Sequence, residues 1–225
     1  MSKIVTVFVR RADLTREQFR RYYEERHVPL ARPHFPDFGF HKTIRNHVVE
    51  PPGSAPGFDC LTEFHFESAA QIQRSAAFMS TPECRRVSED ELNFLDMSQH
   101  PSLEVREQIL AGPPRSPDPP LARKTLLVLR RAAAKSAEAY AASVERFARE
   151  LAERHASGIR RLMLDLVAPS AGASPRFDAI LSLWPEPGRR ALEALSWPDA
   201  TDEARVVDVE AIEWPPAAAP ARKAR

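Results

Sequence analysis

Histidines gather in one short part of this 225-residue chain. Five of the seven lie between positions 27 and 65, namely His27, His34, His41, His47 and His65. The imidazole group titrates near neutral pH, so a local excess of histidine suits proton transfer or the binding of a small polar ligand. For His34, His41 and His47 the alternative is a solvated side chain without a chemical role. The excess marks this region as the first place to look for a site.

The stretch FDCLTEFHF places more polar groups together. Its alternation predicts a strand with these side chains on one face: Asp59, Leu61, Glu63 and His65. A rise of about 3.3 Å per residue puts Glu63 and His65 about 7 Å apart, which suits two groups gripping one small ligand. A buried, ionised glutamate needs a partner. The alternative is therefore a structural pair between Glu63 and Arg45 of the neighbouring predicted strand.

His27 stands at the predicted end of an amphipathic helix. Thr15 is the predicted N-cap of this helix, and Gln18 completes a capping box. Pro29 is expected to end the helix just after His27. The dipole at a helix C-terminus favours the imidazolium, and a histidine held there could exchange a proton with a nearby substrate. The alternative is that the imidazole only caps the last carbonyl groups.

Composition and motifs exclude several classes of protein. Lys plus Arg number 32 and Asp plus Glu number 31, a formal charge of +1 that argues against a nucleic-acid or membrane-surface partner. No HxH, HExxH or CxxC motif occurs, and Cys60 and Cys84 fit no zinc spacing. With seven glycines, the chain has no glycine-rich phosphate loop. We therefore expect neither a metal nor a cofactor.

The hydropathy pattern and the first residues bear on location. No run of 18 apolar residues predicts a membrane helix. The N-terminal stretch MSKIVTVFVRR leads directly into a strand pattern and does not read as a signal peptide. Two ordinary thiols suit a reducing compartment. We expect a cytoplasmic protein.

The chain carries one pattern twice, at offsets of about 120 residues. Three pairs of stretches match: KIVTVFVRR with KTLLVLRR, GFHKTIRNHV with GIRRLMLDLV, and FDCLTEFHF with FDAILSLW. Between the copies, AGPPRSPDPPLAR contains five prolines, which favour an extended linker. We expect a first unit over residues 1–110, a linker over 111–123, a second unit over 124–214 and a disordered tail over 215–225.

Each unit reads as β-α-β-β-α-β, the order of a ferredoxin-like fold. Such a unit covers one face of its sheet with two helices and leaves the other, partly apolar face bare. The second copy is the simplest partner for that bare face. The predicted fold class is therefore α+β, with two tandem ferredoxin-like units whose antiparallel sheets pack face to face as an intrachain pseudo-dimeric α/β barrel.

The two copies differ in their polar residues. In the alignment Ser182 stands opposite Glu63, Trp184 opposite His65, and Leu164 opposite Arg45. This pattern is expected if only the first unit keeps a site and the second serves as its scaffold.

Four stretches of the first unit occur in the order of a known family pattern: RRADLTREQFRRYYEERHVPL, GFHKTIRNHV, FDCLTEFHF and LNFLD. On these motifs, residues 3–110 resemble the EthD family of the dimeric α/β barrel superfamily. The matching positions are Arg10, Phe19, Tyr23, His27, Pro29, Leu30, Asn46, Asp59, Glu63, Phe66, Phe94, Leu95 and Asp96. Cys60 and His65 depart from the pattern, which has Gly and Trp there. The second unit looks like a degenerate copy that keeps Asp178 and Trp184.

The resemblance implies a cofactor-free, metal-free fold with a small pocket. The implied function is an enzyme acting on a small aromatic or lactone-type carbonyl compound by His-mediated proton transfer, in the manner of an isomerase, lyase or decarboxylase of a catabolic or polyketide-type pathway. The implied catalytic residues are His27, Asp59 and Glu63, and the implied substrate-binding residues are Tyr23, His34, Asn46 and His65. The alternatives are a non-catalytic small-molecule binding or accessory protein and, more remotely, a haem-binding protein. Beyond the pseudo-dimer, a further homodimer is also an alternative.

Overall fold

The computed structural model describes residues 2–49, 57–113, 122–168, 176–186, 196–198 and 200–215. Most of the linker expected at 111–123, the second helix expected from Pro187 and nearly all of the tail expected at 215–225 lie outside these residues. The domain boundaries therefore stay predictions. None of the helices in the described ranges is long and apolar enough to span a membrane.

The first half of the chain combines four strands with a nearly continuous helical run and a helix pair. Its strands are β1 (Ser2–Phe8), β2 (Lys42–Val48), β3 (Cys60–Phe66) and β4 (Ser102–Ala111). Between β1 and β2 lie α1 (Arg16–Tyr22), the π-helical η1 (Tyr23–His27), α2 (Val28–Ala31), the 3-10 helix η2 (Arg32–His34) and α3 (Phe35–Phe38). Between β3 and β4 lie α4 (Ala69–Met79), α5 (Pro82–Glu91) and the short η3 (Met97–Gln99).

The second half has four strands and one long helix among its described residues. Its elements are β5 (Ala122–Arg131), α6 (Ala137–Arg154), β6 (Ile159–Val167), β7 (Ala179–Pro185) and β8 (Thr201–Trp214). The strand order within this half is β8-β5-β7-β6, which repeats the order β4-β1-β3-β2 of the first half.

The eight strands form one closed antiparallel barrel in the order β1-β3-β2-β8-β5-β7-β6-β4. Two pairings join the halves, β2 with β8 and β4 with β6. The α+β barrel prediction is thus confirmed, and the two expected sheets are hydrogen-bonded to each other at both edges. Closure satisfies the backbone groups that separate sheets would leave at their edges.

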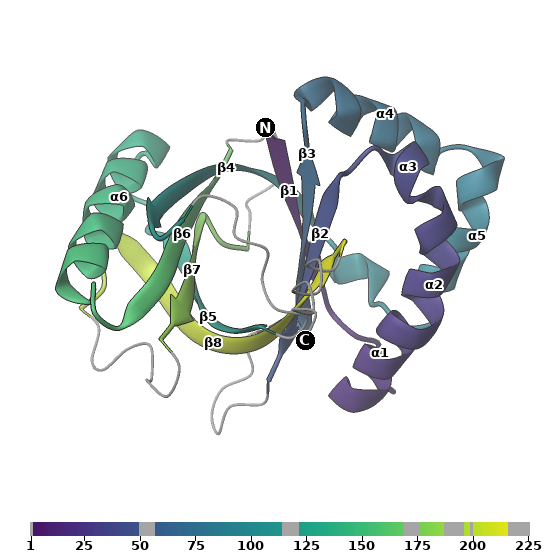
Figure 1. Cartoon of the computed structure of the whole chain (residues 1–225), viewed down its shortest axis with the longest axis horizontal. Helices are drawn as coiled ribbons and strands as arrows, with labels where there is room; N and C mark the ends of the chain where they lie inside the picture. The colour runs from purple at the N-terminus through teal and green to yellow at the C-terminus, as the bar shows by residue number, and fades with distance from the viewer. Residues whose placement is uncertain are drawn as a thin grey trace, which may run out of the picture.

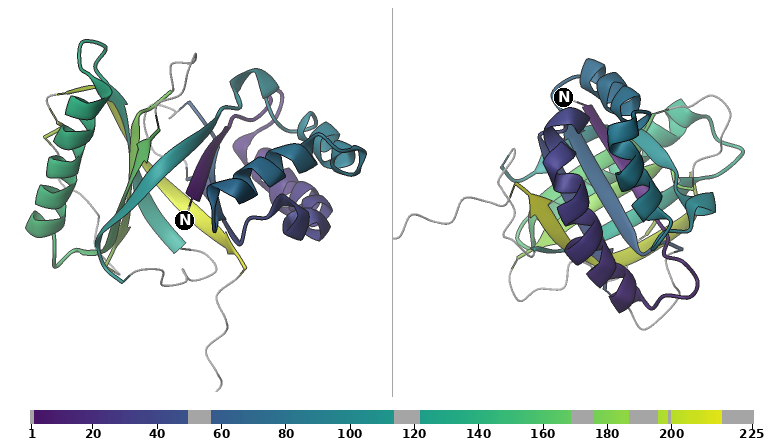
Figure 2. Two further views of the ribbon diagram at one scale, coloured as in Figure 1. Left: turned by 90° about the horizontal axis from the view of Figure 1, so that it is seen from above. Right: turned by 90° about the vertical axis from the view of Figure 1, so that its right-hand side faces the viewer.

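Helices cover the barrel on two opposite sides. In Figure 1, α1 to α5 lie outside the first-half strands and α6 lies outside the second-half strands. Figure 2 shows the same layers from above and from the side. The apolar side chains accordingly form an inner core within the barrel, including Val5, Leu61 and Leu126, and two outer layers beneath the helices. The two faces of each strand therefore belong to different cores.

The helical run after β1 does not end at His27, and this sequence prediction is wrong. The run continues to Phe38, because Tyr23–His27 adopt a π-helical turn in which the Val28 N–H donates to the Tyr23 carbonyl. Pro29 has no N–H, and its ring would clash with a carbonyl in a regular α-helix. One wide turn accommodates such a residue without breaking the helix. His27 is therefore buried inside a helix and is not a C-terminal cap.

The same polar corner occurs in both halves. Asp59 accepts a hydrogen bond from the Arg10 backbone N–H at 3.0 Å, and Asp178 accepts one from the Arg131 N–H at 2.8 Å. Both aspartates also donate their own backbone N–H to the first strand of their half, Asp59 to the Phe8 carbonyl of β1 and Asp178 to the Leu129 carbonyl of β5. The following helices also begin alike, because Thr15 and Ser136 are both N-caps whose side chains accept a backbone N–H. The corner ties a strand end to a helix start.

Candidate functional site

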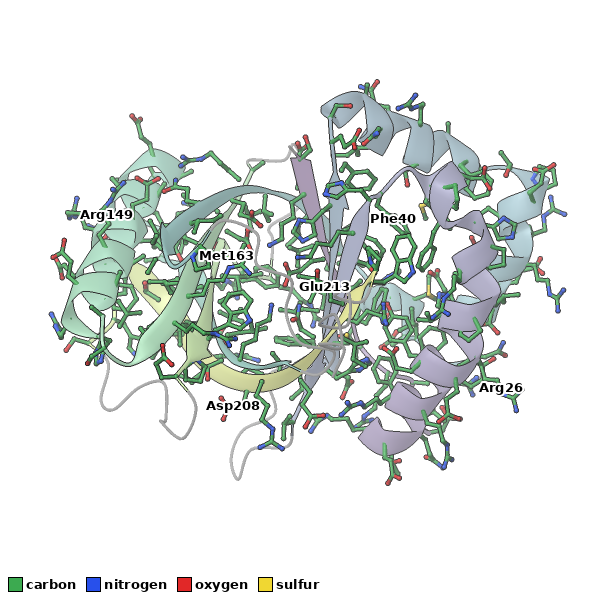
Figure 3. The ribbon with its side chains drawn as sticks, viewed as in Figure 1. Arg26, Phe40, Arg149, Met163, Asp208 and Glu213 are labelled. Carbon is green, nitrogen blue, oxygen red and sulfur yellow. The ribbon has the colours of Figure 1, made fainter. Side chains whose placement is uncertain are left out.

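An apolar cavity of about 160 Å³ lies between the first-half helices and the outer face of β1, β2 and β3. Its wall is rich in aromatic rings: Phe8, Tyr23, Phe35, Phe38, Phe40, Phe64 and Phe66. Figure 3 shows Phe40 in the space between the strands and the helices, whereas Arg26 points away from it. The strand residues that line the cavity belong to the face that alternates with Leu61 and Glu63.

His27 contributes a positioned imidazole to this cavity. Its Nδ1 lies 3.0 Å from the Asp90 Oδ2 of α5, and the ring packs against Phe94 at a centroid distance of 4.9 Å. Burial lowers the pKa of His27, and the Asp90 carboxylate opposes that effect. A neutral ring that donates Nδ1–H to Asp90 presents Nε2 as a proton acceptor. Nε2 has no hydrogen-bond partner in the described ranges, so the geometry is that of an oriented general base.

Two further polar groups of the wall are held by neighbours. The Tyr23 hydroxyl lies 3.0 Å from the Thr62 hydroxyl of β3. The Arg45 guanidinium donates to both oxygens of Glu24, at 2.7 and 3.0 Å. Burial alone would raise the pKa of Glu24, but hydrogen bonds from His47 and Arg45 outweigh it and lower that pKa to about 2. Arg45 is therefore a neutralised cation.

His100 and Glu91 also line the cavity, and both carry polar atoms without a partner in the described part of the chain. The Nε2 of His100 is buried and has no hydrogen-bond partner among the described residues. The His100 ring lies beside the Phe8 ring, at a centroid distance of 4.8 Å. Burial and the charge of His27 lower the pKa of His100. Burial and the neighbouring Asp90 raise the pKa of Glu91 to about 7. The cavity thus joins a base to an acid that is partly protonated at neutral pH.

The chain was compared with known families and structures. Residues 11–98 match the EthD domain model. This part of the chain is an EthD domain. No curated protein matches the chain. Most of the cavity wall lies within this domain, and five wall residues lie outside the matched range: Ile4, Thr6 and Phe8 before it, and His100 and Ser102 after it.

Solved structures share the architecture of the whole chain. An anthrone oxidase-like protein superposes with a TM-score of 0.57 at 10% identity, covering 94% of this chain and 91% of its own. A protein of Fusobacterium nucleatum that is provisionally described as a monooxygenase superposes with a TM-score of 0.52 at 7% identity, covering 94% of this chain and 92% of its own. Another, from Lactobacillus acidophilus NCFM, superposes with a TM-score of 0.50 at 10% identity, covering 93% of each chain. Identities this low show the fold alone. These proteins thus share the fold of the whole chain, first and second halves together.

The predicted site residues fall on two faces of the EthD domain sheet. Tyr23 and His27 line the cavity. Three predicted residues are on strands, namely Asn46, Glu63 and His65. They lie on the sheet face opposite to the cavity, where Asn46 pairs with Leu61 in the strand register. Because alternate residues of a strand face opposite ways, the structure separates Glu63 from His27. It also separates Glu63 from Arg45, so the cross-strand pair considered as an alternative does not form.

Glu63 belongs to a buried ion cluster inside the barrel. Its carboxylate lies 2.7 Å from Lys3 Nζ of β1 in the first half and 2.9 Å from Lys124 Nζ of β5 in the second half. Asn46 donates to Glu63 at 2.9 Å, and Lys3 also contacts Asp165 at 2.7 Å. Burial would raise the pKa of Glu63, but the two lysines hold it well below its ordinary value. Burial raises the pKa of Asp165 to about 6. These contacts join the two halves.

Asp59 and His34 lie away from the cavity wall. Asp59 accepts hydrogen bonds from the Arg10 backbone N–H and, at 3.0 Å, from the Arg16 Nε. The first of these is the corner contact that Asp178 repeats with Arg131. His34 is partly exposed, with its Nδ1 3.7 Å from the Asp37 Oδ2 and its ring tilted against that of Phe78 at a centroid distance of 5.8 Å. Neither residue is brought together with His27.

Sequence reasoning missed three groups that complete the site: Asp90, Glu91 and His100. They lie on α5 and in the segment before β4, more than 60 residues along the chain from His27, where Asp90 bonds His27 and the other two line the same cavity. One signal for Asp90 and Glu91 was present in the sequence, since the acidic stretch SEDELN runs directly into the FLD motif. Among the described residues, no three His, Cys, Asp or Glu side chains are grouped so as to hold a metal ion.

Proposed function

We propose that this protein is a cofactor-free enzyme that acts on a small aromatic or lactone-type carbonyl compound by proton transfer through His27. The observation that carries the proposal is the Asp90–His27 pair, 3.0 Å apart, whose free Nε2 lies in an aromatic cavity. A base fixed in one tautomer can remove a proton from a carbon next to a carbonyl group. The apolar walls would hold the substrate and exclude water.

The roles follow from the contacts. Asp90 holds His27 in the Nδ1–H tautomer and stabilises the imidazolium that forms when Nε2 takes the proton. Glu91, with a pKa of about 7, would return a proton to the substrate oxygen or carbon. The family resemblance implied a catalytic role for Glu63 and substrate binding for Asn46 and His65, but these residues would instead belong to the ion cluster that joins the halves of the barrel. The names of the structural neighbours include an oxidase and monooxygenases, but their low identity supports no oxygenation step here.

We further propose that the chain is two tandem ferredoxin-like units, with the catalytic site in the first. The repeated strand order and the repeated Asp59 and Asp178 corners support this. In the second half α6 packs Tyr140, Val144 and Leu151 directly beneath it, against Leu162 and Leu164 of the sheet. Apolar side chains thus pack between α6 and the sheet on the side that corresponds to the cavity, as expected of a scaffold.

The test is deuterium exchange into carbon acids. Acetophenone and a monocyclic lactone are incubated with the protein in D₂O, and exchange next to the carbonyl is followed by NMR. We expect exchange with the wild type, at least about 100-fold less with His27→Gln, the usual scale of general-base catalysis, and no change with His155→Gln. Binding of these probes without exchange would favour the alternative of an accessory binding protein. A Soret band after haemin titration would favour the haem alternative.

A further inference from the structure

Most polar groups of the cavity wall already have partners. Tyr23 bonds Thr62, and the Thr6 hydroxyl lies 2.9 Å from the Ser102 hydroxyl. Arg45 is engaged by Glu24 and donates to the Thr43 hydroxyl at 3.3 Å. These groups do not need a ligand to satisfy them.

Three titratable groups of the wall have no hydrogen-bond partner in the described ranges, namely His27 Nε2, His100 Nε2 and the Glu91 carboxyl group. Of these, His100 Nε2 is fully buried. A buried polar atom without a hydrogen bond is costly, so a ligand that supplies one is favoured. His27, with Nδ1 on Asp90, accepts a proton, and His100 can bind an oxygen atom or its hydrogen through Nε2.

The charges of the wall disfavour an anionic ligand. Arg45 is the only Lys or Arg among the described lining residues, and Glu24 holds it in a bidentate pair. Glu91 adds a negative charge whenever it ionises. A carboxylate moved into this apolar space would therefore lose its hydration without meeting a free cation.

The size of the cavity limits the ligand to about one ring. The volume of about 160 Å³ is close to that of an apolar cavity of about 150 Å³ that accommodates benzene. The facing rings of Phe8, Phe40 and Phe64 suit a flat molecule. Two fused rings would require the helices to move.

We propose that the cavity takes a neutral, single-ring compound with one hydroxyl or carbonyl oxygen, and that His100 Nε2 binds this oxygen. This inference rests on the proposed function for the identity of the site, and it narrows the substrate class by size and charge. His27 Nε2 then faces the proton of the same ligand.

The experiment is a calorimetric titration at pH 7 with phenol, toluene, benzoate and 1-naphthol. We expect phenol to bind about tenfold more tightly than toluene, the contribution of one good neutral hydrogen bond. Benzoate should bind more weakly than phenol because of its charge, and 1-naphthol because of its size. His100→Phe should bind toluene as the wild type does but lose the phenol preference, whereas His100→Gln should keep part of it. His155→Phe is the matched control and should change nothing.

Benzoate or 1-naphthol binding as tightly as phenol would overturn the inference, and so would a full phenol preference in His100→Phe. Toluene binding and an unchanged melting temperature confirm that the variant is folded, and the wild-type series tests size and charge without any variant. Phenol selectivity without deuterium exchange would refute the proposed function and leave this inference standing. Deuterium exchange that depends on His27 but acts on anionic or two-ring ligands would support the proposed function and refute this inference.

Discussion

At the scale of single residues, the cavity places acid and base groups in environments that move their pKa values towards each other. Burial lowers the pKa of His27 and raises that of Glu91 to about 7. Near neutral pH, a buried histidine can therefore accept a proton while a nearby carboxyl group can still donate one. Groups with such shifted values gather at functional sites more often than elsewhere.

Glu91 should make the stability of the protein depend on pH. Its folded pKa of about 7 is above the ordinary glutamate value of 4.5, so the folded state binds more protons and loses stability as the pH rises from about 4.5 to 7. Glu91→Gln should therefore be more stable than the wild type at pH 8 by up to about 3 kcal/mol, and the difference should shrink towards pH 4.

Urea unfolding at several pH values measures this difference. Glu89→Gln is the matched control, because Glu89 is exposed on the same helix. A stability difference between Glu91→Gln and the wild type that stays constant from pH 4 to pH 8 would show that the Glu91 carboxyl is hydrated in the folded state.

At the scale of elements, the π-helical turn and the aspartate corners set the shape of the site. The π-helical turn carries the chain past Pro29, so that the helical run continues over the sheet to Phe38. The corner at Asp59 fixes the end of β1 to the start of α1, because Arg10 also donates to the Leu14 carbonyl just before the N-cap. Thus the corner positions the helix that carries Tyr23 and His27.

Asp59→Ala and Asp178→Ala should have similar effects on stability. Each removes the acceptor of a backbone N–H and the carboxylate of an arginine ion pair, so each should cost about 1–3 kcal/mol of unfolding free energy. Phenol affinity, corrected for the folded fraction, should be unchanged in both. If Asp59→Ala alone abolished binding or exchange while its stability matched Asp178→Ala, Asp59 would have the catalytic role assigned from the sequence.

At the scale of the whole molecule, closure of the barrel makes the two halves one folding unit. Two strand pairings and the ion pairs Lys3–Asp165 and Lys124–Glu63 cross between them. Figure 3 shows Met163 on the barrel side of β6, opposite to the side of α6. It packs with Ile44 of the other half. A separated half would lose all of these contacts between the halves.

Lys124→Met should be strongly destabilising. It leaves Glu63 buried with one lysine fewer, and breaking a buried pair costs about 3–5 kcal/mol. Adding Glu63→Gln should recover part of the loss, and both halves should unfold in a single urea transition, seen alike by circular dichroism and tryptophan fluorescence. Arg123→Met on the same strand is the control, since its pair with Glu210 is exposed and should contribute less than about 1 kcal/mol. Two separate transitions would mean that the halves fold independently.

The sequence by itself determined the features that depend on local pattern. Alternation in residues 58–66 correctly separated Glu63 and His65 from Thr62 and Phe64, because side chains of a strand alternate whatever it packs against. The capping box of Thr15 and Gln18 and the repeat in register were likewise readable, since they involve neighbouring residues or fixed offsets. The EthD motifs identified the family on the same basis.

Only the tertiary structure decided which face of the sheet holds the cavity and which residues share it. Asp90 meets His27 because α5 folds back over the helical run, and His100 reaches the same cavity from the segment before β4, contacts that no local pattern encodes. The same holds for Glu63, whose partners Lys3 and Lys124 lie 60 and 61 residues away in opposite directions. Contacts between distant segments depend on how whole elements pack, so the sequence placed polar side chains on the faces of strands but did not show which of them meet.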